Sequence, residues 1–115
     1  MQKISFDNFE KIMAYDVMQY TACIEIEFVV EDSPKYTSCW LGKTCAVGGV
    51  KLSKESYWYG LLPDASQAYD FDSFDDFISA PIFDGKNIHE IWDSIVIYTI
   101  DGCDTEYRLP YYLGT

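Results

Sequence analysis

Carboxylates alternate with aromatic rings in residues 69–77, which read Tyr-Asp-Phe-Asp-Ser-Phe-Asp-Asp-Phe. Residues 61–115 carry eleven acids and two bases, against eight acids and six bases in residues 1–60. A segment of this kind can bury its rings and leave its carboxylates at the surface, which favours a positively charged protein over a nucleic acid or an anionic membrane. We predict a partner-binding surface made of Tyr69, Asp70, Phe71, Asp72, Asp75, Asp76, Asp84 and Asp93.

The same aspartates raise the question of calcium, which takes several carboxylate oxygens as ligands. The calcium-loop pattern D-x-[DN]-x-[DN]-G is not met, because Phe74 stands at the third ligand position and Asp75 stands where the glycine is needed. Asp75 and Asp76 are instead expected in the first turn of a helix, where the helix dipole favours negative charge. We predict neither a metal nor a cofactor.

Nucleophilic and acid–base chemistry have few candidates. His89 is the single histidine, and no neighbour in the sequence orients it as a base, so we expect a structural role for it. The four cysteines include no C-x-x-C pair, which argues against zinc, and we expect them to be reduced and mostly buried. Cys45, expected in a loop beside Lys43, is the one candidate for a reactive thiol. The sequence therefore favours a protein that is not an enzyme.

Length and composition indicate one folded domain spanning residues 1–115. Hydrophobic residues make up 49% of the chain, which is enough apolar area to offset the chain entropy despite a net charge of −11. Aromatic residues make up 17%, more than a small core needs, so we expect some rings to serve as contact surface. No secretion signal and no membrane-spanning run is visible, so we predict a cytoplasmic protein without a membrane partner.

In the first half, apolar residues at helical spacing behind Ser5 predict a helix over about residues 5–16. Strict alternation of apolar and acidic residues predicts a strand over 22–30, and a second strand is expected over 36–41. The glycines and lysines that follow predict a long loop. Residues 56–62 then have apolar side chains on both faces, which is typical of a central strand.

In the second half, Ser73 with Asp76 three residues later forms a capping-box pattern for a short helix that Pro81 must end. Asp84 is expected to cap a further amphipathic helix, in which the apolar side chains of residues 88–95 recur at i, i+3, i+4 and i+7. A β-branched run predicts a strand over 95–100, and the alternation in residues 107–113 predicts an edge strand because of Pro110.

These elements indicate an α+β fold, with a small antiparallel sheet of four to five strands and two or three helices packed on one face. The leading functional hypothesis is a protein-binding module of the inhibitor, immunity or nucleic-acid-mimic type, which docks its acidic second half on the basic surface of another protein and does not bind nucleic acid directly. One alternative is a homo-oligomeric accessory protein, with a homodimer as the simplest form. The other is a small carboxylate-based enzyme or ligand-binding domain, with an aromatic pocket around Trp40, Trp58 and Tyr59.

Overall fold

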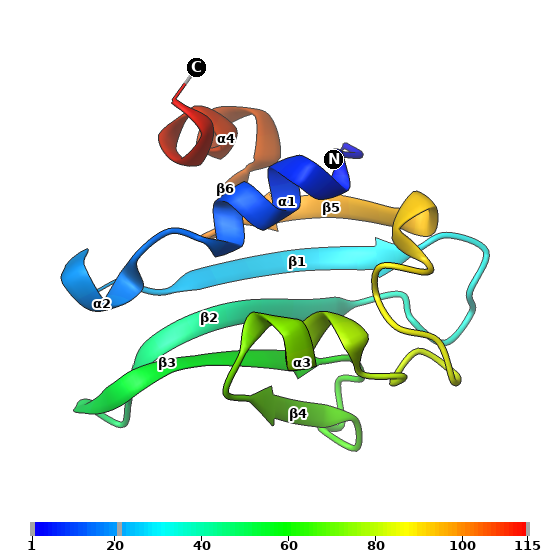
Figure 1. Ribbon diagram of the computed structural model, residues 1–115. Helices are drawn as coiled ribbons and strands as arrows, with labels where there is room; N and C mark the ends of the chain where they lie inside the picture. The colour runs from blue at the N-terminus through cyan, green and yellow to red at the C-terminus, as the bar shows by residue number, and fades with distance from the viewer. Residues whose placement is uncertain (1, 21, 115) are drawn as a thin grey trace.

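The computed structural model describes residues 2–20 and 22–114 and has an α+β fold (Figure 1). The elements follow in the order α1 (Phe6–Met13), α2 (Val17–Tyr20), β1 (Ile24–Val30), β2 (Cys39–Val47), β3 (Val50–Gly60), β4 (Ala68–Phe71), α3 (Phe74–Ser79), the 3-10 turn η1 (Trp92–Ser94), β5 (Ile95–Ile100), β6 (Cys103–Asp104) and α4 (Thr105–Leu113). The strands form one antiparallel sheet in the order β4-β3-β2-β1-β5-β6. The predicted class and the antiparallel sheet are confirmed, but the described residues form six strands and four short helices, more than the sequence indicated.

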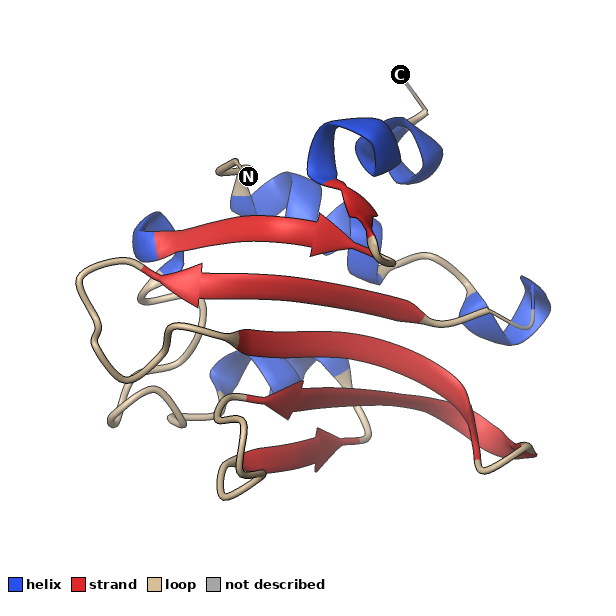
Figure 2. Ribbon diagram, turned by 180° about the vertical axis from the view of Figure 1, so that it is seen from behind, coloured by secondary structure: helices blue, strands red, loops and turns tan. Residues whose placement is uncertain are grey.

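The helices are distributed unequally over the two faces of the sheet. Helices α1 and α3 lie on one face, and α4 lies beside α1 near β5 (Figure 1). Seen from behind, the strands lie in front and the described part of the chain places no helix over them (Figure 2). We call this second side the open face of the sheet. None of the helices in the described residues is long and apolar enough to cross a membrane.

Local sequence signals explain the elements on the helix-covered face. The side chain of Ser5 caps α1 by accepting a hydrogen bond from the amide of Asn8 at 3.1 Å, and Ser73 caps α3 in the same way through Asp76 at 3.1 Å. In β1 the even-numbered apolar side chains are buried under the helices, as the alternation predicted. The apolar side of α1 packs through Phe9, which is fully buried.

The loop predicted after residue 41 is wrong. Strand β2 continues through Gly42 and Cys45 to Val47, and a tight turn at Gly48 and Gly49 joins it to β3. Both turn glycines have positive φ, 59° and 81°, as a two-residue hairpin turn requires. Strand β3 is paired on both sides, which explains its apolar side chains, but it lies second from the edge of the sheet and not at the centre.

The helix predicted over 88–95 is also wrong, although its apolar residues are in the core. Ile88 and Ile95 are buried, at 0% and 2% exposure. The backbone makes turns and the short η1, because β5 begins at Ile95 and pairs that residue with Val30 of β1. The turn is capped by Asn87 and Glu90 and not by Asp84. The Glu90 side chain accepts a hydrogen bond from the Asn87 amide at 3.0 Å, and the Asn87 side chain accepts one from the Glu90 amide at 2.9 Å.

The edge strand predicted over 107–113 is in fact helix α4. Thr105, Leu109 and Tyr112 recur at i, i+4 and i+7 and turn toward the core, a helical spacing that coexists with the two-residue alternation. Pro110 lies inside this helix. A tight turn at Asp101 and Gly102 leads into the two-residue edge strand β6, and α4 begins directly after it at Thr105, so the edge strand ends before residue 107.

Candidate functional site

Strand β4 turns the predicted site residues in two directions. Tyr69 pairs with Tyr59 and Phe71 pairs with Tyr57, and these rings face the helices, where Phe71 and Tyr59 meet edge to face at 6.1 Å. Asp70 lies between them in the sequence, so it projects to the open face. Tyr69 and Phe71 are therefore partly buried core residues, and Asp70 is separated from them by the sheet.

The next three aspartates lie around the start of α3. Asp72 is exposed and forms an ion pair with Lys54 at 3.3 Å. Asp75 and Asp76 are exposed in the first turn of α3, as predicted, where negative charge stabilises the helix. These three residues are neighbours, but they belong to the helix layer and not to the open face.

The last two predicted residues lie apart from the others in the chain and bind different partners. Asp84, in a turn with φ of 55°, pairs with Lys35 at 3.0 Å. Asp93 lies in η1, where its backbone carbonyl accepts a hydrogen bond from Lys3 at 2.8 Å. The predicted surface is therefore distributed over several elements, and lysines from the first half pair with two of its six aspartates.

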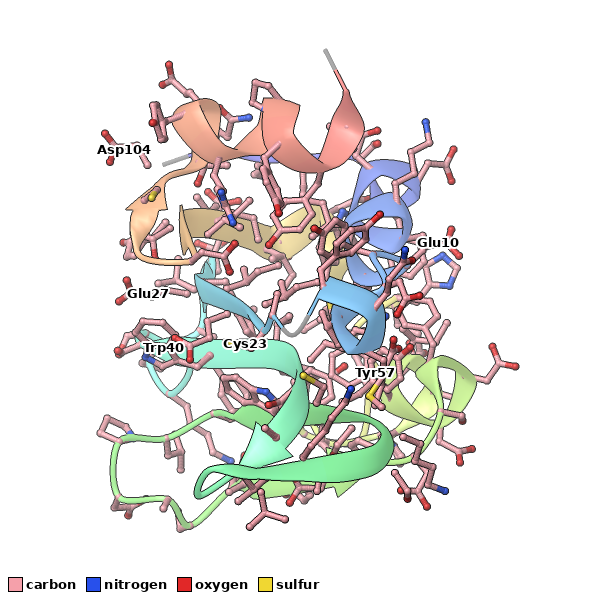
Figure 3. All side chains as sticks on the ribbon, turned by 90° about the vertical axis from the view of Figure 1, so that its left-hand side faces the viewer. Glu10, Cys23, Glu27, Trp40, Tyr57 and Asp104 are labelled. Carbon is pink, nitrogen blue, oxygen red and sulfur yellow. The ribbon has the colours of Figure 1, made fainter. Side chains whose placement is uncertain are left out.

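A second acidic and aromatic surface, which the sequence analysis missed, lies on the open face. Strand pairing places Glu27 opposite Trp40, Gly42 opposite Glu25 and Trp58, and Asp70 opposite Trp58. Figure 3 shows Glu27 and Trp40 on one side of the sheet, and Glu10 and Tyr57 on the side of the helices. We call the surface formed by Glu25, Glu27, Trp40, Trp58 and Asp70 the tryptophan–carboxylate face.

Gly42 allows Trp58 to lie across the sheet. A Cβ atom at position 42 would be 2.5 Å from Cζ2 and 2.7 Å from Cε2 of Trp58, and 2.1 Å from the carbonyl oxygen of Ile24. The indole ring therefore occupies the space above Gly42, between Asp70 on one side and Glu25 on the other. Trp40 stands opposite Gly60, where a Cβ atom would meet nothing within 4 Å. Both tryptophans are partly exposed.

The carboxylates of this face have no cation of their own. In residues 2–20 and 22–114 the ion pairs join Lys3 to Glu31, Lys35 to Asp84, Lys43 to Glu55, Lys54 to Asp72 and Arg108 to Asp101. Glu25, Glu27 and Asp70 are in none of them. Glu27 accepts one weak hydrogen bond from the hydroxyl of Thr99 at 3.4 Å. Three charges beside two indole rings are thus available to a partner.

The aromatic pocket proposed around Trp40, Trp58 and Tyr59 is not formed. Tyr59 points to the helix-covered side, where it is 2% exposed, stacks on Phe77 at 4.2 Å and donates a hydrogen bond to the Phe77 carbonyl at 2.8 Å. Burial raises the pKa of its phenol. The two tryptophans lie on the opposite side of the sheet from this ring.

A hollow of about 660 Å³ lies between the N-terminal segment and η1. His89 is exposed on its rim and stacks on Phe6 at a centroid distance of 4.2 Å. Two of the polar side chains that line the hollow, Ser5 and Glu90, already accept backbone amide hydrogens as caps. In the described ranges, no three His, Cys, Asp or Glu side chains come together as metal ligands.

The position predicted for Cys45 is wrong, because this cysteine is buried in β2 with its thiol donating to the Ala22 carbonyl at 3.2 Å. Lys43 is buried as well, at 2% exposure, and holds the end of α1 by donating to the carbonyls of Met13 and Tyr15, each at 2.8 Å. All four cysteines are free, and Cys23 is the exposed one. Burial raises the pKa of the Cys39 thiol to about 11.

Comparison with known proteins gives no further assignment. No protein-family model, no curated protein and no solved structure matches the chain.

Proposed function

We propose that the chain is a non-enzymatic protein-binding module, which docks an acidic and aromatic face on a basic surface of another protein, as inhibitors, immunity proteins and nucleic-acid mimics do. The net charge of −11 disfavours nucleic acid and anionic membranes as direct partners. A basic protein surface remains the complementary partner.

One observation carries the proposal: the tryptophan–carboxylate face combines two partly exposed indole rings with three carboxylates that no lysine or arginine of the described chain neutralises. Tryptophan is enriched among residues that dominate binding energy at interfaces. Unpaired carboxylates around it supply charge complementarity, which accelerates association and selects basic partners.

The test compares two acidic surfaces with the same number of charges. Glu25→Gln/Glu27→Gln/Asp70→Asn removes three charges from the tryptophan–carboxylate face, and Asp72→Asn/Asp75→Asn/Asp76→Asn removes three from the start of α3. Each immobilised variant is used to capture proteins from a lysate of the native host at low and moderate salt, with the wild type alongside. We expect a partner that is lost as salt rises, lost with the first variant and kept with the second.

If the partner is lost with the second variant alone, the binding site lies at the predicted aspartates around α3 and not on the tryptophan–carboxylate face. Equal capture by both variants and the wild type would refute binding through charge. Loss with both variants would indicate an unspecific effect of net charge and would equally contradict a defined docking face.

Self-association is a second candidate, favoured by the tyrosines of α4. Tyr107 is 78% exposed and Tyr111 is 52% exposed, and the exposed Tyr20 lies near Tyr15, which bonds to Tyr111. Rings exposed to this degree are typical of contact surfaces. Light scattering at micromolar concentration tests this candidate, because a dimer that Tyr107→Ser/Tyr111→Ser converts to a monomer would support it, and a monomeric wild type would exclude it.

A further inference from the structure

The two tryptophans of the open face stand at a spacing that an extended peptide can match. Trp40 pairs with Gly60 and Trp58 pairs with Gly42, so the two tryptophans occupy one diagonal of a four-residue square on β2 and β3. Such diagonal neighbours are about 7–8 Å apart. Side chains at i and i+2 of an extended segment lie on one face, about 6.4–6.8 Å apart.

Each tryptophan has a carboxylate as its direct cross-strand neighbour. Glu27 is opposite Trp40, and Asp70 is opposite Trp58. Direct neighbours of this kind have Cβ atoms about 4.5–5.5 Å apart. The face therefore presents two similar units, each consisting of one indole ring and one carboxylate, and Glu25 adds a further charge beyond the ring of Trp58.

The two glycines of the square keep the indole rings accessible. Trp58 lies over Gly42, so one side of its ring packs on backbone, and the space above Gly60 beside Trp40 is open. A planar group can therefore approach the rings without displacing a side chain at either glycine. A guanidinium is planar, stacks on aromatic faces and binds carboxylates through two parallel hydrogen bonds, whereas a lysine ammonium is a compact and strongly hydrated charge.

We propose that the tryptophan–carboxylate face binds an extended Arg-x-Arg segment of a partner protein, with one guanidinium on Trp40 and Glu27 and the other on Trp58 and Asp70. This inference rests on the proposed function and specifies which side chains of the basic partner are recognised. It makes arginine the preferred cation, and a spacing of two residues the preferred register.

The test uses fluorescein-labelled peptides and measures anisotropy at moderate salt with the full chain. The probe contains two arginines separated by one glycine, the first control replaces both arginines with lysine, and the second places the two arginines side by side. We expect the probe to bind more tightly than either control. Trp40→Ala and Trp58→Ala should each weaken the probe by about 2- to 30-fold, the range of one cation–π contact, and weaken the lysine peptide less.

Charge-matched variants separate recognition from general attraction. Glu27→Gln/Asp70→Asn removes the two carboxylates paired with the tryptophans on the open face, and Asp7→Asn/Glu10→Gln removes two from α1, on the side of the helices where Figure 3 shows Glu10. The first pair should weaken the probe clearly more than the second. Circular dichroism and urea unfolding establish that each variant remains folded.

Two different failures are distinguishable. If no peptide binds in a salt-dependent way, both the docking face and the proposed function are overturned. If the peptides bind with equal affinity, and the tryptophan variants bind like the wild type while Glu27→Gln/Asp70→Asn weakens all peptides, the proposed function stands and the arginine proposal is overturned.

Discussion

Replacement of Gly42 by alanine is the most direct test of how the open face is built. The added Cβ atom would stand 2.1 Å from the backbone oxygen of Ile24 and 2.5 Å from the ring of Trp58. The first contact cannot be relieved by a side-chain rotation, because it involves the backbone of the neighbouring strand β1. Relief of the two contacts requires β1 and β2 to separate locally and the ring of Trp58 to move away from the sheet, and both changes cost stability.

The expected magnitude follows from the severity of the overlap. One methyl group added to a well-packed site costs typically about 1–3 kcal/mol, and contact with a fixed backbone atom places Gly42→Ala near the upper end, at about 3 kcal/mol. The free energy of unfolding of small proteins falls by roughly 1–3 kcal/mol per molar urea. The urea concentration at the unfolding midpoint should therefore fall by roughly 1–3 M. Urea unfolding followed by circular dichroism measures this shift.

Gly60→Ala is the matched control, because the same methyl group at position 60 meets no atom within 4 Å and the backbone there is extended. Loss of a glycine from the unfolded chain should then stabilise the protein by about 0.4–1 kcal/mol. If Gly42→Ala proves as stable as Gly60→Ala, the ring of Trp58 does not lie across Gly42, and the stacking argument for the open face is wrong.

Three further predictions concern the helix layer and the thiols. Lys43→Met removes a buried ammonium that pairs with Glu55 at 2.7 Å and leaves that carboxylate without its partner. The free energy of unfolding, measured with urea, should fall by about 3 kcal/mol, and adding Glu55→Gln should restore part of it. The hydroxyl of Tyr111, 2.7 Å from that of Tyr15, is the main cause that raises the pKa of Tyr15 from 10.0 to about 12. The stability linked to this phenol is therefore complete below pH 10 and lost as pH rises through about 12, and Tyr111→Phe should move the phenolate absorbance change of Tyr15 toward pH 10. Cys23 should be the first thiol to react with maleimide, because it is exposed, and Cys23→Ser should remove that first phase; an unchanged first phase would contradict the placement.

Local signals in the sequence predicted the elements that local physics decides. The caps at Ser5 and Ser73 are hydrogen bonds between residues three positions apart, and the alternation in β1 follows from the geometry of a single strand. The prediction failed where two elements competed for the same residue. Ile95 completes a helical stripe with Ile88, but its pairing with Val30 belongs to another strand, and that pairing is invisible in a local window.

The sequence did not predict the tryptophan–carboxylate face for a related reason. The downstream aspartates are adjacent in the chain, so they were expected to share a surface, but β4 turns Asp70 to the open face while α3 carries Asp75 and Asp76 in the helix layer. Trp58 and Asp70 are twelve positions apart, and Glu27 and Trp40 thirteen, so only the register of the strands brings each pair together. One signal was available: glycine at positions 42 and 60, in strands that also carry tryptophan, indicates a place where another group approaches the backbone closely.

The distribution of cations over the molecule connects the two functional candidates. The ion pairs of the described residues use Lys3, Lys35, Lys43, Lys54 and Arg108, and each of them binds an acid that lies outside the tryptophan–carboxylate face. A bare sheet face with exposed tryptophans invites contact with a second copy, but facing copies would bring their unpaired carboxylates together, and like charges across an interface are unfavourable. The same carboxylates that attract a basic partner therefore oppose stacking of this face on itself. A homodimer, where one forms, is accordingly expected to use the tyrosines of α4 and to leave the tryptophan–carboxylate face free, so a variant that disrupts self-association should retain binding of the arginine peptide.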